Sequence, residues 1–205
     1  MNENYSNKCE EILSNIKSKK KLLLHSCCAP CSSYVITYLT NYFDITILYY
    51  NPNIFPQEEY EKRKKEQIKL IHDLKVKNKL NILDCDYDNK EYNKLINGLE
   101  NEPERGNRCT ICYKMRIEKT AYLAKENHYD YFCTTLSVSP YKNSNLINEI
   151  GEDLEKEYQV KWLYSDFKKK DGYKKSIELS KKYNLYRQDY CGCIYSKPKQ
   201  LHIWN

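Results

Sequence analysis

Short β-prone runs alternate with polar segments of helical period from residue 21 to residue 166, and this alternation restricts the fold more than any other feature. Such a pattern is typical of a parallel sheet with helices packed on it, because a parallel connection has to cross over the sheet. The sequence therefore predicts an α/β fold with a parallel sheet and flanking helices. A chain of 205 residues lies within the range of one domain, so we expect a single domain over residues 1–205.

The expected strands cover residues 22–25, 45–50, 80–83, 131–134 and 161–164, and the expected main helices cover 33–40, 57–76, 112–126, 146–158 and 173–183. Unusual residues follow four of the strands. They are Cys27, Cys28 and Cys31 after the first, Asn51 and Pro52 after the second, Cys85 and Asp86 after the third, and residues 137–143 after the fourth. Loops at the carboxyl ends of parallel strands line the ligand crevice, so these residues are expected to meet at one edge of the sheet.

Seven of the ten cysteines form three clusters, which are Cys27, Cys28 and Cys31, then Cys109 and Cys112, then Cys191 and Cys193. The polar first twenty residues do not have the pattern of a secretory signal, so we expect reduced thiols and a cytoplasmic protein. Seven thiols exceed the four ligands of one closed zinc site and favour an iron–sulfur cluster with a second site beside it. The spacing also fits a zinc knuckle or a redox dithiol, and the Cys-Gly-Cys pair can close into a reactive disulfide.

The other three cysteines are weaker candidates for metal ligands. Cys9 in a polar amino-terminal helix and Cys133 inside the fourth strand are expected to be buried and inert. Cys85 stands between Asp84 and Asp86 and can reach the same crevice, so its role stays open.

Polar residues near this edge have both functional and structural interpretations. Asp86 and Asp88 can complete a metal's shell or deliver a proton, or they can cap a turn. The segment of residues 139–143 suits a phosphate or ribose through its amides and Lys142, although Asn143 can equally be a helix cap. No glycine-rich phosphate loop follows the first strand, so we expect an inorganic cofactor rather than a nucleotide.

The charge pattern is compatible with a nucleic-acid partner. The net charge is +6, and the residues Lys168, Lys169, Lys170 and Arg187 are interleaved with Tyr173, Tyr183 and Tyr186. Such residues can pair with phosphates and stack on unpaired bases, or they can form a solvated helix face. No run approaches the roughly 18 apolar residues of a membrane span, so no membrane partner is expected.

Five ordered motifs carry a family resemblance over about residues 20–196. They are His-Ser-Cys-Cys-Ala-Pro-Cys at 25–31, Tyr-Asn-Pro-Asn-Ile at 50–54, Arg108 and Cys109 with Cys112 and Arg116, Thr134 to Leu136 with Lys142 and Asn143, and Tyr-Cys-Gly-Cys at 190–193. The chain resembles the QueH-type epoxyqueuosine reductases. The resemblance implies a HUP-like fold and a cobalamin-independent oxidoreductase that performs the last step of queuosine synthesis at the wobble nucleoside of tRNA.

The resemblance also implies the composition of the site. A [4Fe–4S] cluster and a second, mononuclear iron are expected on the seven clustered cysteines and on Asp86, with the division of thiols between the two left open. Asp86 is the expected proton donor in catalysis. The expected substrate contacts are Asn51, Arg116, Tyr141, Lys142 and Asn143. The partners are a tRNA that carries epoxyqueuosine in its anticodon and an unidentified electron donor.

Two other functions are compatible with some of these features. A tRNA thiolation enzyme also joins an α/β sheet to an iron–sulfur cluster, but it needs a pyrophosphate loop where this chain has cysteines. A zinc-stapled RNA-binding module would use the cysteines for structure alone, and it would be colourless and redox-silent.

Overall fold

Five parallel strands form one sheet in the order β3-β2-β1-β4-β5 in the computed structural model, which describes residues 3–197. Every neighbouring pair is parallel, with Leu22 opposite both Ile45 of β2 and Tyr131 of β4. This order is that of Rossmann-like sheets, so the predicted α/β class with a parallel sheet and flanking helices is confirmed. The strands are β1 (Lys20–His25), β2 (Phe43–Leu48), β3 (Leu80–Leu83), β4 (Tyr131–Thr134) and β5 (Lys161–Trp162).

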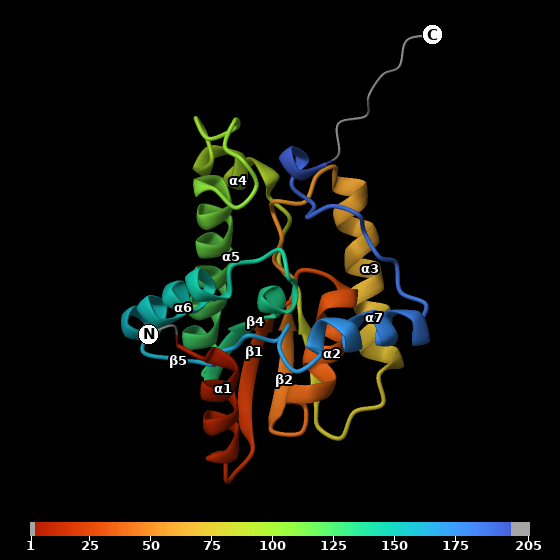
Figure 1. Cartoon of the computed structure of the whole chain (residues 1–205), viewed down its shortest axis with the longest axis vertical. Coiled ribbons are helices and arrows are strands. Elements are labelled where there is room, and N and C mark those ends of the chain that lie inside the picture. Colours follow the sequence, from red (N-terminus) through yellow and green to blue (C-terminus); the bar gives the residue numbers. More distant parts are fainter. Residues whose placement is uncertain (1–2, 198–205) are drawn as a thin grey trace.

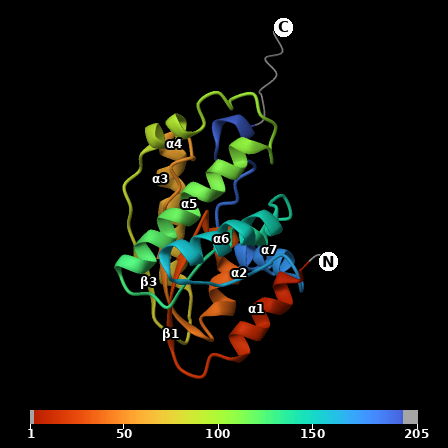
Figure 2. The same ribbon diagram turned by 90° about the vertical axis from the view of Figure 1, so that its left-hand side faces the viewer.

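Helices cover both faces of the sheet (Figures 1 and 2). One apolar cluster joins β1 and β2 to α1, α2 and α3, and a second joins the opposite sheet face to α4, α5 and α6, while α7 packs on α2. Leu22 and Leu24 belong to the first cluster and Leu23 to the second, because successive side chains of a strand point to opposite faces. The helices are α1 (Tyr5–Ser14), α2 (Ala29–Leu39), α3 (Gln57–Asp73), α4 (Asn89–Leu95), α5 (Asn107–Glu126), α6 (Ser144–Tyr158) and α7 (Gly172–Lys182).

The helix starts differ from the sequence predictions where the cysteines lie. α2 begins at Ala29 instead of residue 33, with Pro30 in its first turn, where the missing amide hydrogen costs nothing. α5 begins at Asn107 instead of residue 112, so both Cys109 and Cys112 lie on a helix. The short helix α4 was not expected, and Asp88 caps it by accepting from the amides of Lys90 and Glu91.

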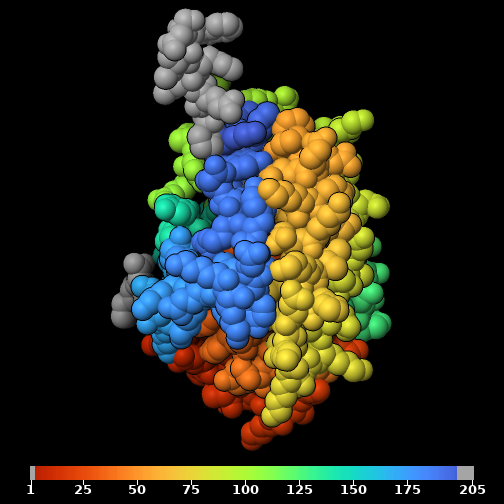
Figure 3. Space-filling view, turned by 90° about the vertical axis from the view of Figure 1, so that its right-hand side faces the viewer, coloured from red at the N-terminus to blue at the C-terminus, as the bar shows by residue number. Residues whose placement is uncertain are grey.

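The segment of residues 183–193, which follows α7, lies alongside α3, as Figure 3 shows for the blue and gold segments. Hydrogen bonds hold it there. Lys69 Nζ donates to the carbonyl of Tyr183 at 2.8 Å, and Glu66 accepts from the amide of Tyr186 at 2.9 Å. This path carries the Cys-Gly-Cys segment from the far end of the sequence back to the carboxyl edge of the sheet. In residues 3–197, no helix combines the length and apolar character that crossing a bilayer requires.

Candidate metal centre

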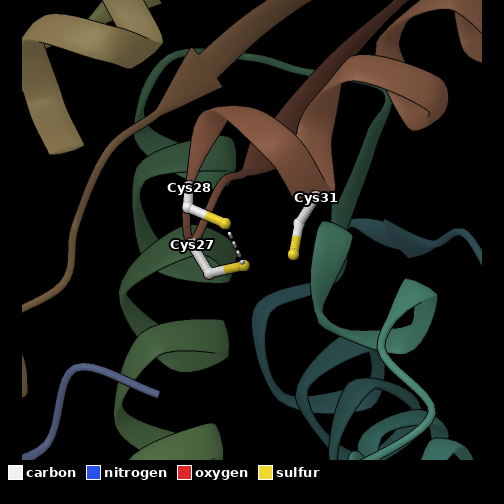
Figure 4. Close-up of side chains that lie close together, drawn as sticks. All are labelled: Cys27, Cys28 and Cys31. Carbon is white, nitrogen blue, oxygen red and sulfur yellow. Dashed lines mark hydrogen bonds between the residues drawn. The ribbon is translucent and has the colours of Figure 1, made fainter. Parts of the chain in front are cut away.

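Cys27, Cys28 and Cys31 form a compact thiol group at the carboxyl end of β1, here called the trio (Figure 4). Cys28 is the N-cap of α2 in an extended conformation, and Cys31 lies one turn further on. The three sulfur atoms lie within 4.8 Å of one another, and the Cys27 and Cys28 sulfurs are 3.8 Å apart. Of the residues that the structure describes, this is the only set of three or more Cys, His, Asp or Glu side chains gathered so closely.

The trio is arranged to hold negative charge. Hydrogen bonds from the Cys28 and Cys31 thiols lower the pKa of Cys27 well below its ordinary value. The same bonds raise the pKa of Cys28 to about 12 and raise that of Cys31 as well. Cys27 is therefore the member of the trio that loses its proton most readily, and a bound metal would replace the thiol protons of all three.

The other four clustered cysteines form a second group, here called the quartet. Cys109 and Cys112 come from the first turns of α5, and Cys191 and Cys193 come from the returning carboxyl-terminal segment. All four line one small cavity of about 10 Å³, and the Tyr92 hydroxyl lies 3.2 Å from the Cys193 sulfur. Burial raises the pKa of Cys112 to about 12.

A larger cavity of about 370 Å³ connects the two groups. Cys27 and Cys31 of the trio and Cys191 of the quartet all line it. Its volume is within the roughly 300–1,000 Å³ of small-molecule sites. The remaining lining residues are Glu104, Arg116, Leu136, Ser139, Tyr141, Lys142, Tyr173, Arg187, Gln188, Asp189, Tyr190 and Ser196.

The Cys-Gly-Cys segment is held by α3 and by the loop after β2. Arg63 is 2 % exposed and donates to the carbonyls of Cys191 at 3.2 Å and Tyr190 at 3.4 Å, while Glu59 neutralises it at 2.7 Å. The amide of Phe55 donates to the carbonyl of Gly192 at 2.9 Å. The segment is therefore fixed from both sides by main-chain contacts.

Two further basic side chains reach into the centre. Lys142 Nζ lies 3.0 Å from the Cys191 sulfur, and the neighbouring Cys191 and Tyr113 raise its pKa against the opposing effect of burial. Arg116 on α5 lines both cavities. Positive charge close to thiolates stabilises them.

His25, at the end of β1 and just before the trio in the sequence, has a structural role. Its Nε2 donates to the carbonyl of Tyr50 at 3.1 Å, so its Nδ1 accepts from the Thr134 hydroxyl at 2.8 Å. Complete burial and the nearby Arg116 lower the pKa of His25 to about 3, which keeps the ring neutral. This ring ties the carboxyl ends of β1, β2 and β4 together.

Most residues expected at the site lie there. Arg116, Tyr141 and Lys142 line the cavities, and the Asn51 side chain accepts from Arg116 and donates to the carbonyl of Ser26. Asn143 caps α6, as the structural interpretation predicted. Of the basic and aromatic segment, Tyr173 and Arg187 line the larger cavity.

Other predicted positions lie apart from the thiols. Asp86 is exposed and lines neither cavity. Cys85 also lines neither cavity and packs against the apolar cluster of the α5 face. Cys9 and Cys133 are buried at 4 % and 0 % exposure in the other apolar cluster, as predicted.

Sequence reasoning assigned no role at the site to Arg63, Tyr92 or Tyr190, although Tyr190 stands in one of the family motifs. Arg63 has only one local signal, which is Glu59 one turn earlier on the same helix, and that spacing is ordinary on helix surfaces. Nothing in the sequence indicates that α3 faces the carboxyl-terminal segment.

The donor set fits a thiolate-bound metal. Three sulfurs already lie within 4.8 Å of one another, and four more surround a neighbouring cavity. Soft thiolates suit zinc and iron–sulfur clusters, whereas hard ions such as Mg²⁺ prefer oxygen. The fold and the site thus define a class, that of Rossmann-like α/β proteins with a thiol-rich centre at the carboxyl edge of the sheet.

Comparison with known proteins identifies the family. The family model described as "Epoxyqueuosine reductase QueH" matches residues 22–199. The chain belongs to this family, and the prediction of an epoxyqueuosine reductase, an oxidoreductase, is confirmed by this membership.

Two relatives named epoxyqueuosine reductase QueH are each 44 % identical to the chain. The protein of Streptococcus pyogenes serotype M1 aligns over 89 % of this chain and 72 % of its own length, and that of Staphylococcus epidermidis over 96 % and 86 %. A solved structure, a predicted subunit of a tRNA methyltransferase from Methanocaldococcus jannaschii, is 17 % identical with a TM-score of 0.46, over 80 % of this chain and 74 % of that one. That likeness is too distant to bear on function.

Proposed function

We propose that the chain reduces epoxyqueuosine to queuosine within tRNA, and that its seven clustered thiols hold a [4Fe–4S] cluster and a second iron. The observation that carries this proposal is the cavity of about 370 Å³ in which Cys27, Cys31 and Cys191 meet Tyr141 and Lys142. Thiols from two distant parts of the sequence face a space of nucleoside size there. Family membership supports the reaction, and the cavity supports its proposed location.

The reaction defines what the residues have to do. Conversion of an epoxide to an alkene takes up two electrons and two protons and releases water. When bound, the iron centres supply single electrons and Lewis acidity. The chain itself has to orient the cyclopentane ring against the thiol-rich wall, exclude water and deliver protons.

Binding of the nucleoside is assigned to the mouth of the cavity. Tyr141 is 60 % exposed and offers a face for stacking on an unpaired base, and Arg187 is placed to meet a phosphate. Lys142 is proposed to contact the substrate, as are Asn51 and Asn143 near the same edge. Asp86 is proposed as proton donor and iron ligand on sequence grounds, because it follows β3 at this edge.

The first test is the visible and EPR spectrum of the anaerobically purified protein before and after dithionite, with iron, zinc and sulfide assayed on the same sample. The expected result is a brown chromophore that bleaches on reduction, with iron and sulfide present. Zinc without sulfide would contradict the proposed cofactor and favour a structural metal. An assay on tRNA that carries epoxyqueuosine then tests the reaction itself.

Single cysteine variants distinguish the cysteines proposed as metal ligands from a cysteine of the hydrophobic core. Cys28→Ala and Cys191→Ala are expected to abolish epoxyqueuosine reduction, because each removes a proposed ligand. Cys133→Ala is the control, since Cys133 is completely buried and bonds only to the β4 and β5 region. It should keep activity while losing about 1 kcal/mol of stability. Full activity in either ligand variant would contradict the proposal.

A further inference from the structure

Arg116 is almost completely buried between the trio and the quartet. Its side chain is 1 % exposed and lines both cavities. Nε donates to the carbonyl of Cys112 at 3.0 Å, and Nη1 donates to Asn51 Oδ1 at 3.4 Å. Asn51 in turn donates to the carbonyl of Ser26, which precedes Cys27. The guanidinium is therefore fixed at the junction of the two thiol groups.

This buried cation has no carboxylate partner within residues 3–197, and its Nη2 has no hydrogen-bond partner there. Arg63 provides the contrast, because Glu59 lies 2.7 Å from it. Glu104 lines both cavities, but its side chain is exposed and forms no ion pair in the described part of the chain. An uncompensated buried charge is strongly destabilising, so Arg116 needs a negative partner from another source.

The groups that surround Arg116 are thiols. Burial by itself would lower the pKa of Arg116, but Cys112, Cys191 and Cys27 more than offset this effect and raise it. These residues belong to both thiol groups. Metal binding would deprotonate them and add negative charge on every side of the guanidinium.

We propose that Arg116 is the fixed counter-charge of the metal centre and raises its reduction potential. The inference rests on the iron–sulfur centre proposed above. Reduction adds one negative charge to such a centre, and a nearby cation stabilises the reduced form more than the oxidised form. Arg116 is then a positioning residue that acts through the centre, in place of the substrate contact expected from the sequence.

The experiment compares the reconstituted wild type with Arg116→Gln and Arg116→Lys in anaerobic redox titrations followed by EPR. Lys114→Gln is the matched control, because Lys114 is an exposed cation on the same helix and water screens its charge. Arg116→Gln should shift the midpoint potential in the negative direction. Arg116→Lys should stay near the wild type, and Lys114→Gln should not shift it. Circular dichroism verifies the fold of each variant.

The remaining results of this experiment either contradict or support the role of Arg116 as a counter-charge. It is overturned if Arg116→Gln shifts the potential no more than Lys114→Gln, or if the Gln and Lys variants shift it equally. A raised KM for tRNA with an unchanged potential also overturns it and restores the substrate contact. Failure of Arg116→Gln alone to take up iron, with Arg116→Lys loading normally, supports the need for the charge. A wild type without a cluster refutes the proposed metal centre and this inference with it.

Discussion

At the scale of single residues, Gly192 decides whether the Cys-Gly-Cys segment can reach the centre. Its φ is +110°, a conformation that favours glycine. A Cβ atom there would lie 2.8 Å from Ile54 Cγ1 and 3.0 Å from Arg63 Nη1. The glycine therefore allows Cys191 and Cys193 to approach α3 and the loop after β2 together.

Gly192→Ala is expected to lower both metal uptake and thermal stability. The backbone strain is about 1–3 kcal/mol, and the contact with Ile54 would displace the two flanking cysteines. The measurement is the iron content after anaerobic reconstitution, together with Tm. Gly98→Ala is the control, because Gly98 also has a positive φ, +83°, but nothing lies within 4 Å of its added Cβ. Equal effects of the two substitutions on iron content would contradict the steric explanation.

At the scale of elements, Asp130 joins the start of β1 to the start of β4. Its carboxylate accepts from the amide of Lys21 at 2.8 Å and from Lys20 Nζ at 3.0 Å, while its own amide donates to the carbonyl of Lys21. Burial alone would raise the pKa of Asp130, but the Lys21 amide and the Lys20 ammonium lower it below 3.8. These bonds stabilise the register between two central strands.

Asp130→Asn should therefore destabilise the protein in a pH-dependent way. A lowered pKa in the folded state stabilises it above the unfolded value near 3.8, and this contribution is lost as the pH falls through the folded pKa. The expected loss at pH 7 is about 1 kcal/mol or less, since solvent screens the partly exposed pair. Urea unfolding at pH 7 and at pH 3 measures it, and the difference in stability between the wild type and the variant should be smaller at the lower pH.

The matched control for this change is Asp153→Asn on α6. Asp153 lies 3.8 Å from Lys156, and its side chain is 83 % exposed. Little change in stability is expected at either pH. A loss in Asp130→Asn that is the same at both pH values would show that the charge of Asp130 does not contribute.

At the scale of the whole molecule, the site is formed by segments that are far apart in the sequence. The loops after β1 and β4, Arg116 in the middle of α5 and the carboxyl-terminal segment all contribute to one cavity. The net charge of +6 is compatible with a polyanionic substrate. Affinity for tRNA should then depend on salt as well as on the nucleoside.

Binding of tRNA is expected to weaken linearly in log Kd against log salt concentration, because phosphate contacts release counterions. Arg187→Gln should reduce the slope by about one phosphate contact, since Arg187 lines the cavity. Lys17→Gln is the control, because Lys17 precedes β1 at the opposite edge of the sheet. Filter binding at several salt concentrations measures both slopes. A salt-independent affinity would indicate recognition of a free nucleoside.

The sequence by itself determined the fold class and most of the thiol ligand candidates. The spacing of apolar residues, the turn residues and the spacing of cysteines are local properties that can be read along the chain. Parallel strands then bring the loops after β1, β2 and β4 to one edge of the sheet. Cys9 and Cys133 were separable from the ligand candidates because Cys9 lies in a polar helix far from the clusters in the sequence and Cys133 lies inside a strand. The starts of α2 and α5 were missed because cysteines signal no helix start.

Only the tertiary structure decided how the seven thiols divide into the trio and the quartet. The Cys-Gly-Cys segment reaches Cys112 through contacts with Arg63 on α3, and these contacts leave no signature in the sequence. The isolation of Arg116 from any carboxylate in the described residues is likewise a property of the packed structure. Which charges face one another depends on long-range packing, whereas which residues form strands and helices depends mainly on their neighbours in the chain.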